Sequence, residues 1–272
     1  MLVQTDMGAR MVKPVSISRA LPRYLDRLRR RRKRKKPFRA SSAEYSDLNR
    51  FTGGINAGEL IVIAGRPSTG KTTLALNIAL SAAIDRVLPT AILSLGLTCD
   101  QVLSRLVASM AGVDRSSLRR RALTPKDWNR IERVEESLAR APIFISESNS
   151  LTTAQLPRLV RDLKDESGIG LVIVDELQEL FPTGPGVDGV PTAQTVPRAL
   201  KGMARELDVA VLAVSRLSRR IERRRRNRMV LSDLWGSGVE HDADLIVTLF
   251  KRDFYIWGRI GSLKHHEIPR RK

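Results

Sequence analysis

The sequence predicts an α/β fold in which a mainly parallel central sheet is flanked by helices. Six apolar runs have the length of strands, at 60–64, 90–95, 142–146, 171–174, 209–214 and 245–250. Helical patterns lie among them, at 71–84, 99–111, 125–140, 153–166 and 197–207. Continuously apolar strands that alternate with helices are typical of a parallel sheet covered on both faces. We therefore expect one sheet between layers of helices.

The charge of the chain points to a polyanionic partner. The 272 residues have an apolar content of 42% and a net charge of +19, which suits one α/β domain with an extension that binds nucleic acid. Residues 1–40 hold fourteen Lys and Arg against two Asp, and so carry twelve of these charges. We predict a basic N-terminal extension at 1–44 and the main domain at 45–272. A solvated tail without a specific partner is the alternative for the extension.

Cysteine content and hydropathy limit the cellular compartments that the sequence fits. Cys99 is the only cysteine, so an internal disulfide is impossible and a reducing compartment fits. No apolar run reaches 18 residues, which predicts no membrane span. We expect a cytoplasmic, nucleoid-associated protein. The basic, acid-poor N-terminus also fits an organelle transit peptide.

Elements can be assigned in order along the chain. Ser18 could cap a helix at 19–34 with an apolar stripe at Ile17, Leu21, Leu25 and Leu28, and eight basic residues follow at 29–36. Thr124-Pro125-Lys126-Asp127 is a good helix start, with Thr as cap and Pro at the first position. Residues 182–194 are rich in Gly, Pro and Thr and predict a long exposed loop, which in a compact domain is often functional.

A phosphate-binding loop joins the first strand to its helix. The loop reads Gly65-Arg66-Pro67-Ser68-Thr69-Gly70-Lys71-Thr72-Thr73. The glycines let the backbone curl so that N–H groups point at phosphate oxygens, and the helix adds the positive end of its dipole. Lys71 can reach the β- and γ-phosphates, and the Thr72 hydroxyl can ligate Mg²⁺. This pattern predicts a nucleoside triphosphate as the ligand, and a chance glycine turn is the alternative.

A second nucleotide element follows the strand at 171–174. Asp175 and Glu176 stand at its carboxyl end, where α/β sheets bind ligands. A carboxylate at this place can hold Mg²⁺ through its water shell. We assign Asp175 to the metal site, beside Thr72, while an ordinary surface acid is the alternative.

A series of further motifs accompanies the two nucleotide elements. The stretches are 47–54, 65–73, 124–128, 141–145, 175–178, 200–207, 215–219, 231–234 and 242–244. With these motifs, in this order, the chain resembles the C-terminal motor domain of a DnaB-type replicative helicase, a superfamily 4 enzyme with a RecA-like fold. The resemblance covers roughly residues 45–250. The family implies a hexameric ring that threads single-stranded DNA and unwinds duplex with ATP.

Several positions depart from the family's pattern. The family's Ser-Leu-Glu, whose carboxylate polarises the attacking water, is here Ser94-Leu95-Gly96, and the glutamine that senses the γ-phosphate is Arg216. The family's DNA-contacting Asp-Leu-Arg-Glu-Ser-Gly has become 233–238, with Trp235 and Gly238. We also find no arginine-finger motif after residue 250 and no primase-contacting N-terminal domain, so we expect both to be absent.

Two residues could replace the missing groups. Glu176 follows the metal acid, a position that holds the catalytic glutamate in other phosphate-loop ATPases, and could orient water. Arg216 could act as a finger in cis. Losing an arginine finger costs ~10³–10⁵ in rate, and losing the water-positioning group costs a further ~10². We therefore predict Lys71, Glu176 and Arg216 as catalytic, with a solvated acid and a steering charge as the alternatives.

Basic residues after the fifth strand are the main candidates for DNA contacts. A flexible cationic loop suits a phosphate backbone, and Trp235 could stack on a base. The 29–36 run is a second candidate, or a localisation address. The predicted DNA-binding residues are Arg219, Arg220, Arg223, Arg224, Arg225, Arg226, Trp235 and Gly238.

The resemblance also suggests an assembly. In this family a linker helix before the motor docks on the next subunit, which the 17–28 stripe could do here, or it could pack on its own domain. We expect a homo-oligomer, hexameric by resemblance, or a composite ring with another helicase subunit. The function expected is ATP-driven translocation or unwinding on single-stranded DNA in replication. The alternatives are a catalytically impaired, ATP-responsive DNA-binding or helicase-regulating derivative, and a RecA-like recombination or repair adaptor.

Overall fold

The computed structural model describes residues 17, 21–22, 54–183, 195–218, 221, 230, 233–234 and 238–249. The chain divides into two units, Met1–Phe38 and Arg39–Lys272. In the first unit residues 17, 21 and 22 are helical, and the rest of the helix predicted at 19–34 lies outside the described residues. The boundary predicted at 44/45 and most of the loop at 182–194 lie outside them too.

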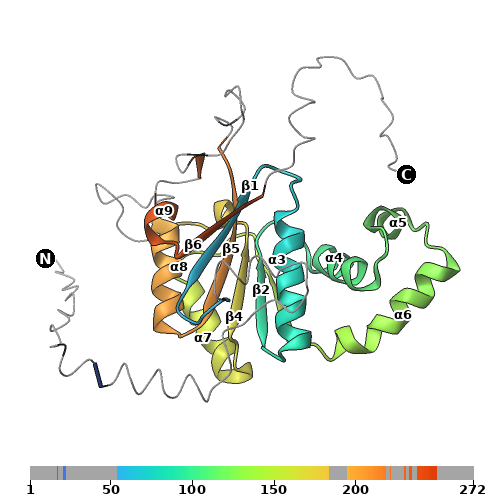
Figure 1. Ribbon diagram of the computed structural model, residues 1–272, viewed down its shortest axis with the longest axis horizontal. Coiled ribbons are helices and arrows are strands. Elements are labelled where there is room, and N and C mark those ends of the chain that lie inside the picture. Colours follow the sequence, from blue (N-terminus) through green and yellow to red (C-terminus); the bar gives the residue numbers. More distant parts are fainter. Residues whose placement is uncertain are drawn as a thin grey trace, which may run out of the picture. The chain divides into compact units, whose positions relative to one another are not determined.

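Six strands of the second unit form one sheet in which every pairing is parallel (Figure 1). The order is β3-β2-β4-β5-β1-β6. All six runs predicted to be strands are strands, with ends that differ by at most two residues. Their bounds are β1 Leu60–Gly65, β2 Thr90–Ser94, β3 Ile143–Glu147, β4 Leu171–Asp175, β5 Ala210–Arg216 and β6 Leu245–Leu249.

Helices cover both faces of the sheet. Figure 1 shows α3 on one face and α8 on the other. The five predicted helices are present, and two short ones, α5 and α9, were not predicted. The bounds are α3 Lys71–Leu80, α4 Cys99–Ala111, α5 Arg115–Arg120, α6 Pro125–Ala139, α7 Leu156–Ser167, α8 Thr195–Glu206 and α9 Val239–Asp242. A π-helical turn, Ser81–Asp85, follows α3, and a 3₁₀ turn, Leu177–Glu179, follows β4.

The core explains why the central strands are apolar throughout. Leu60 and Val62 of β1 belong to a cluster with Leu200 and Met203 of α8, while the intervening Ile61 is buried as well. Both faces of such a strand are therefore covered. The edge strands β3 and β6 are only partly buried. The edge strands are less buried because each lacks a neighbouring strand on one side, and the predicted parallel sheet flanked by helices is confirmed.

Local capping sets the helix that was predicted from its start. The Thr124 side chain accepts a hydrogen bond from the Asp127 amide, and the Asp127 side chain accepts one from the Thr124 amide. Pro125 occupies the first position, where a helix needs no N–H donor. The start predicted for α6 is confirmed.

One carboxylate ties three elements together at the amino end of the sheet. Asp244 Oδ2 accepts hydrogen bonds from the Leu60 amide at 2.7 Å and from Lys201 Nζ at 2.6 Å. Lys201 Nζ also donates to the Gly58 carbonyl at 2.8 Å. The beginning of β1, helix α8 and the residue before β6 are thus fixed to one another. Among the described residues no helix has the length and hydropathy that a bilayer span requires.

Candidate nucleotide site

The phosphate loop begins where β1 ends. A Cβ on Gly65 would lie 2.6 Å from Thr69 Oγ1 and 3.1 Å from the Leu249 carbonyl oxygen, so no other residue fits here without movement. Gly70, at the start of α3, has a φ of 98°, which strains any other residue. Inside the loop, Thr69 Oγ1 donates to the Arg66 carbonyl at 2.7 Å. These contacts hold the tight curl that the sequence predicts.

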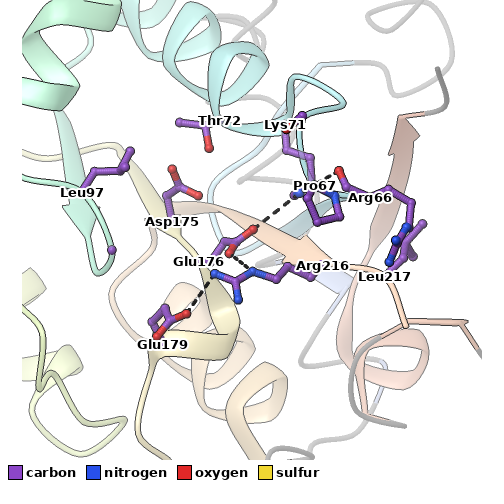
Figure 2. A pocket seen from close by; sticks show the side chains of 12 residues that line it. Arg66, Pro67, Lys71, Thr72, Leu97, Asp175, Glu176, Glu179, Arg216 and Leu217 are labelled. Atoms are coloured by element: carbon purple, nitrogen blue, oxygen red, sulfur yellow. Dashed lines mark hydrogen bonds and ion pairs between the residues drawn. The ribbon is translucent and has the colours of Figure 1, made fainter. Parts of the chain in front are cut away.

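A cavity of about 490 Å³ opens beside this loop, at the carboxyl ends of the central strands (Figure 2). This volume is in the range of small-molecule sites. Eight predicted site residues line it, and four further residues join them. The predicted ones are Arg66, Pro67, Ser68, Lys71, Thr72, Asp175, Glu176 and Arg216, and the others are Gly96, Leu97, Glu179 and Leu217. Gly65, Thr69, Gly70 and Thr73 belong to the loop but do not line the cavity.

Thr72 and Asp175 meet as predicted for a metal site. Asp175 is 7% exposed, and its burial raises the pKa of the carboxyl group, a shift that a hydrogen bond from the Thr72 hydroxyl opposes. A buried carboxylate beside a hydroxyl offers two oxygen ligands of the kind Mg²⁺ prefers. The described residues contain no group of three or more His, Cys, Asp and Glu side chains that could hold a metal ion. A Mg²⁺ ion here would take its other ligands from water and phosphate, as is usual for this ion.

Lys71 reaches into the cavity from the start of α3. Its Nζ lies 3.2 Å from the Arg66 carbonyl oxygen and 3.5 Å from Glu176 Oε1. Burial lowers the pKa of Lys71, and the neighbouring Glu176 opposes this shift. The ammonium group is therefore partly desolvated and is paired with the Glu176 carboxylate.

Arg216 binds two carboxylates at once. Its Nε donates to Glu176 Oε2, and its Nη2 donates to Glu179 Oε1 at 3.0 Å (Figure 2). Glu176 thus contacts Lys71 with one oxygen and Arg216 with the other. The structure brings the three predicted catalytic residues Lys71, Glu176 and Arg216 together in one ion-pair network.

Glu179 is a site residue that the sequence did not predict, because no local pattern signals its contact with Arg216. Glu176 has extended backbone and precedes the 3₁₀ turn Leu177–Glu179, whose last residue is Glu179. Both carboxylates contact Arg216. Gln178 of the same turn accepts a hydrogen bond from the Arg216 amide at 3.2 Å and donates to Ser215 Oγ at 3.1 Å, which fixes the turn to the end of β5.

Most predicted DNA-binding residues lie outside the described part of the chain. These are Arg219, Arg220, Arg223, Arg224, Arg225, Arg226 and Trp235, whereas Gly238 directly precedes α9 and is partly buried. The described residues show where the segment 219–232 begins and ends. Leu217 and Leu234 form an antiparallel bridge, and the Ser218 amide donates to the Asp233 carbonyl at 2.7 Å. Because Leu217 also lines the cavity, the Leu217–Leu234 pair that flanks the segment lies next to the nucleotide site.

Comparison with known proteins adds independent evidence. The replicative DNA helicase DnaB of Geobacillus stearothermophilus is 36% identical over 213 residues, 78% of this chain and 47% of that protein. The replicative DNA helicase DnaC of Bacillus subtilis (strain 168) is 33% identical over 242 residues, 88% and 53% of the two chains. The chain thus spans about half the length of these relatives.

Solved structures agree with the sequence relatives. An ATPase domain matches with a TM-score of 0.76 and 28% identity, over 89% of this chain and 86% of that one. A DnaB-like replicative helicase, described with its interactions with primase, matches with a TM-score of 0.76 and 28% identity, over 92% and 60%. The predicted RecA-like fold and the DnaB-type resemblance are confirmed. Residues 41–268 match the family model of the DnaB-like helicase C-terminal domain, and the chain belongs to this family.

Proposed function

We propose that the chain is the ATP-driven motor of a replicative DNA helicase. It would bind single-stranded DNA and couple ATP hydrolysis to translocation or unwinding during replication. The observation that carries the proposal is the cavity of about 490 Å³ that is lined together by Lys71, Thr72, Asp175 and Arg216. Such a set can bind a triphosphate, hold a divalent cation and place a cation at the terminal phosphate.

Each of these residues has a definite task in this proposal. The loop amides and Lys71 bind the β- and γ-phosphates. Thr72 and Asp175 would hold Mg²⁺, which would supply positive charge against the negative charge of the phosphates. Arg216 stabilises the charge on the transferred group from within the same chain. The water-orienting role of Glu176 remains a prediction, and its contacts give it the added task of holding Lys71 and Arg216 in place.

The DNA-binding part of the proposal rests on charge and on position. The arginines at 219–226 form a cationic segment, and the pairing of Leu217 with Leu234 supports its place beside the nucleotide cavity. Contacts of this kind neutralise phosphates without reading base sequence. We propose further that the motor acts as an oligomer, in a hexameric or composite ring, at the nucleoid in the cytoplasm.

A second candidate function is an ATP-responsive DNA-binding or helicase-regulating protein without turnover. Gly96 favours it, because this residue lines the cavity without bringing a functional group. The two functions share nucleotide and DNA binding and differ only in catalysis.

ATP hydrolysis by the purified chain separates the two candidates. Phosphate release is measured with and without single-stranded DNA, beside a Lys71→Ala variant. The motor predicts DNA-stimulated release that the variant abolishes. Nucleotide binding with no release above the variant's background, with or without DNA, would refute the motor and leave the regulatory function.

A further inference from the structure

Glu179 is a carboxylate of the nucleotide cavity that differs from Glu176 in how it is held. Glu176 is 15% exposed and engages a cation with each of its oxygens. Glu179 is 42% exposed and gives only Oε1 to Arg216. Among the described residues no hydrogen-bond partner is found for its Oε2. Glu179 therefore has one oxygen without a cation partner to offer a water molecule, whereas each oxygen of Glu176 already contacts a cation.

The space around Glu179 is set by a glycine on the neighbouring strand. A Cβ built on Gly96, after the end of β2, would have the Glu179 Cγ as its nearest neighbour, at 4.0 Å. This is an ordinary contact, and Gly96 is not among the glycines with positive φ. Gly96, which follows β2, and Glu179, which follows β4, therefore border the same part of the cavity. A side chain at residue 96 is compatible with the backbone there.

We propose that Glu179 orients the attacking water through its Oε2, and that a γ-phosphate competes with Glu179 for Arg216. This inference rests on the proposed ATPase function and assigns that site a further catalytic residue. A triphosphate carries more charge than one carboxylate and competes for the guanidinium of Arg216. The exchange releases the Oε1 of Glu179, so that both oxygens of the carboxylate are free of the guanidinium when a γ-phosphate is bound.

The chemical step balances with the groups named. Glu179 accepts a hydrogen bond from a water molecule, whose oxygen forms a bond to the γ-phosphorus. The bond between that phosphorus and the β,γ-bridging oxygen breaks, and ADP leaves with its electron pair. One proton of the water passes to the Glu179 carboxylate and then to solvent. The products are ADP, inorganic phosphate and one proton, and Glu179 is regenerated.

A Glu179→Gln variant should show two effects of opposite sign. Turnover should fall about 100-fold, the lower end of what a positioned general base contributes. A non-hydrolysable triphosphate, adenylyl imidodiphosphate, should bind about two- to fivefold more tightly, because a half-exposed ion pair of modest strength no longer competes for Arg216. ADP has no γ-phosphate, and its affinity should be unchanged. Glu135→Gln, at an exposed position of α6, is the control and should change none of the three values.

Gly96 offers a test by relocation. In the Glu179→Gln background, Gly96→Glu should restore at least tenfold of the lost turnover, because it returns a carboxylate to the same space from β2. Gly96→Gln in that background should restore nothing. Thermal unfolding of each double variant confirms that it is folded. Equal turnover of the two folded double variants would overturn the proposal, because charge at this place would then be irrelevant.

The other outcomes separate this inference from the proposed function. A wild-type chain without turnover would refute the motor and this inference with it. A wild-type chain with turnover, beside a Glu179→Gln variant within twofold of it, would refute only the role of Glu179. Slower turnover without tighter binding of the analogue would mark a merely structural residue and also overturn the proposal. A loss confined to Glu176→Gln would assign the water to Glu176 instead.

Discussion

Replacing Gly65 by alanine tests whether close packing at the end of β1 shapes the phosphate loop. The new Cβ would lie 2.6 Å from Thr69 Oγ1, 3.3 Å from Lys71 Cγ and 3.1 Å from the Leu249 carbonyl oxygen. The first distance is shorter than real contacts allow. The third neighbour is backbone of β6 and cannot rotate away. The loop must therefore move, and the Thr69 hydroxyl must loosen its 2.7 Å hydrogen bond to the Arg66 carbonyl.

The magnitude follows from the cost of overpacking. One extra methyl group in a well-packed site costs about 1–3 kcal/mol. If the loop relaxes in the free protein and the cost falls on the nucleotide complex, affinity drops about five- to 150-fold. If the loop cannot relax, the same cost appears in the free energy of unfolding. We expect the two losses together to total about 1–3 kcal/mol.

Both quantities can be measured on the same preparation. A fluorescent ATP analogue gives the affinity, and urea denaturation gives the free energy of unfolding. Gly202→Ala is the matched control, because nothing lies within 4 Å of a Cβ there and residue 202 is inside α8. It should leave nucleotide binding unchanged and stabilise the fold by roughly 0.5–1 kcal/mol. If Gly65→Ala changes neither affinity nor stability by more than about 0.5 kcal/mol, the packing argument is wrong.

Three further predictions concern the metal site, the sheet and the DNA. Burial raises the pKa of Asp175, so Mg²⁺-dependent nucleotide affinity should fall with acidification at a higher pH than for an ordinary aspartate. The free energy of unfolding of the free protein should instead decrease as pH rises through that pKa. Measurements of nucleotide affinity and of unfolding against pH check these two expectations. Asp175→Asn should remove both pH dependences. Asp244→Ala should lower the free energy of unfolding by about 2 kcal/mol in urea denaturation, because the buried Leu60 amide loses a charged acceptor. Arg198→Ala, which breaks a 3.9 Å pair at an 83% exposed side chain, should cost less than about 0.5 kcal/mol. Arg224→Ala should reduce the log–log salt slope of single-stranded DNA binding by about 0.7; an unchanged slope would remove this arginine from the DNA site.

The fold was predictable where the sequence shows a hydrophobic pattern or a helix-capping motif. The buried strands are continuously apolar because helices cover both of their faces, and Thr124 with Asp127 forms the capping box that the spacing predicts. The helices α5 and α9 have six and four residues, too few for a helical period to show. The helix predicted from 153 begins at Leu156 instead. Before it, the Thr152 amide donates to the Gln155 side chain and forms a turn that the apolar pattern does not reveal.

The parts of the site that lie within one continuous sequence motif were predictable. The phosphate loop is one stretch of sequence, and Asp175 ends a strand whose length is evident, so their meeting follows from the rule for parallel sheets. The contact of Glu179 with Arg216, and its approach to Gly96, depend on the strand order β3-β2-β4-β5-β1-β6. The order sets β4 between β2 and β5, and no local pattern encodes it. A missed carboxylate at the meeting point of three strand ends is the expected result.

The end of β5 connects the nucleotide cavity directly to the segment that we propose binds DNA. Arg216 lines the nucleotide cavity, and Leu217, the next residue, pairs with Leu234 to close the base of the arginine-rich segment. Arg216 and Leu217 are adjacent in sequence, so no residue separates the nucleotide cavity from the start of the segment that we propose binds DNA. Insertions at this junction should abolish both activities together. Variants that keep one and lose the other should instead be found farther out in the segment, beyond Ser218.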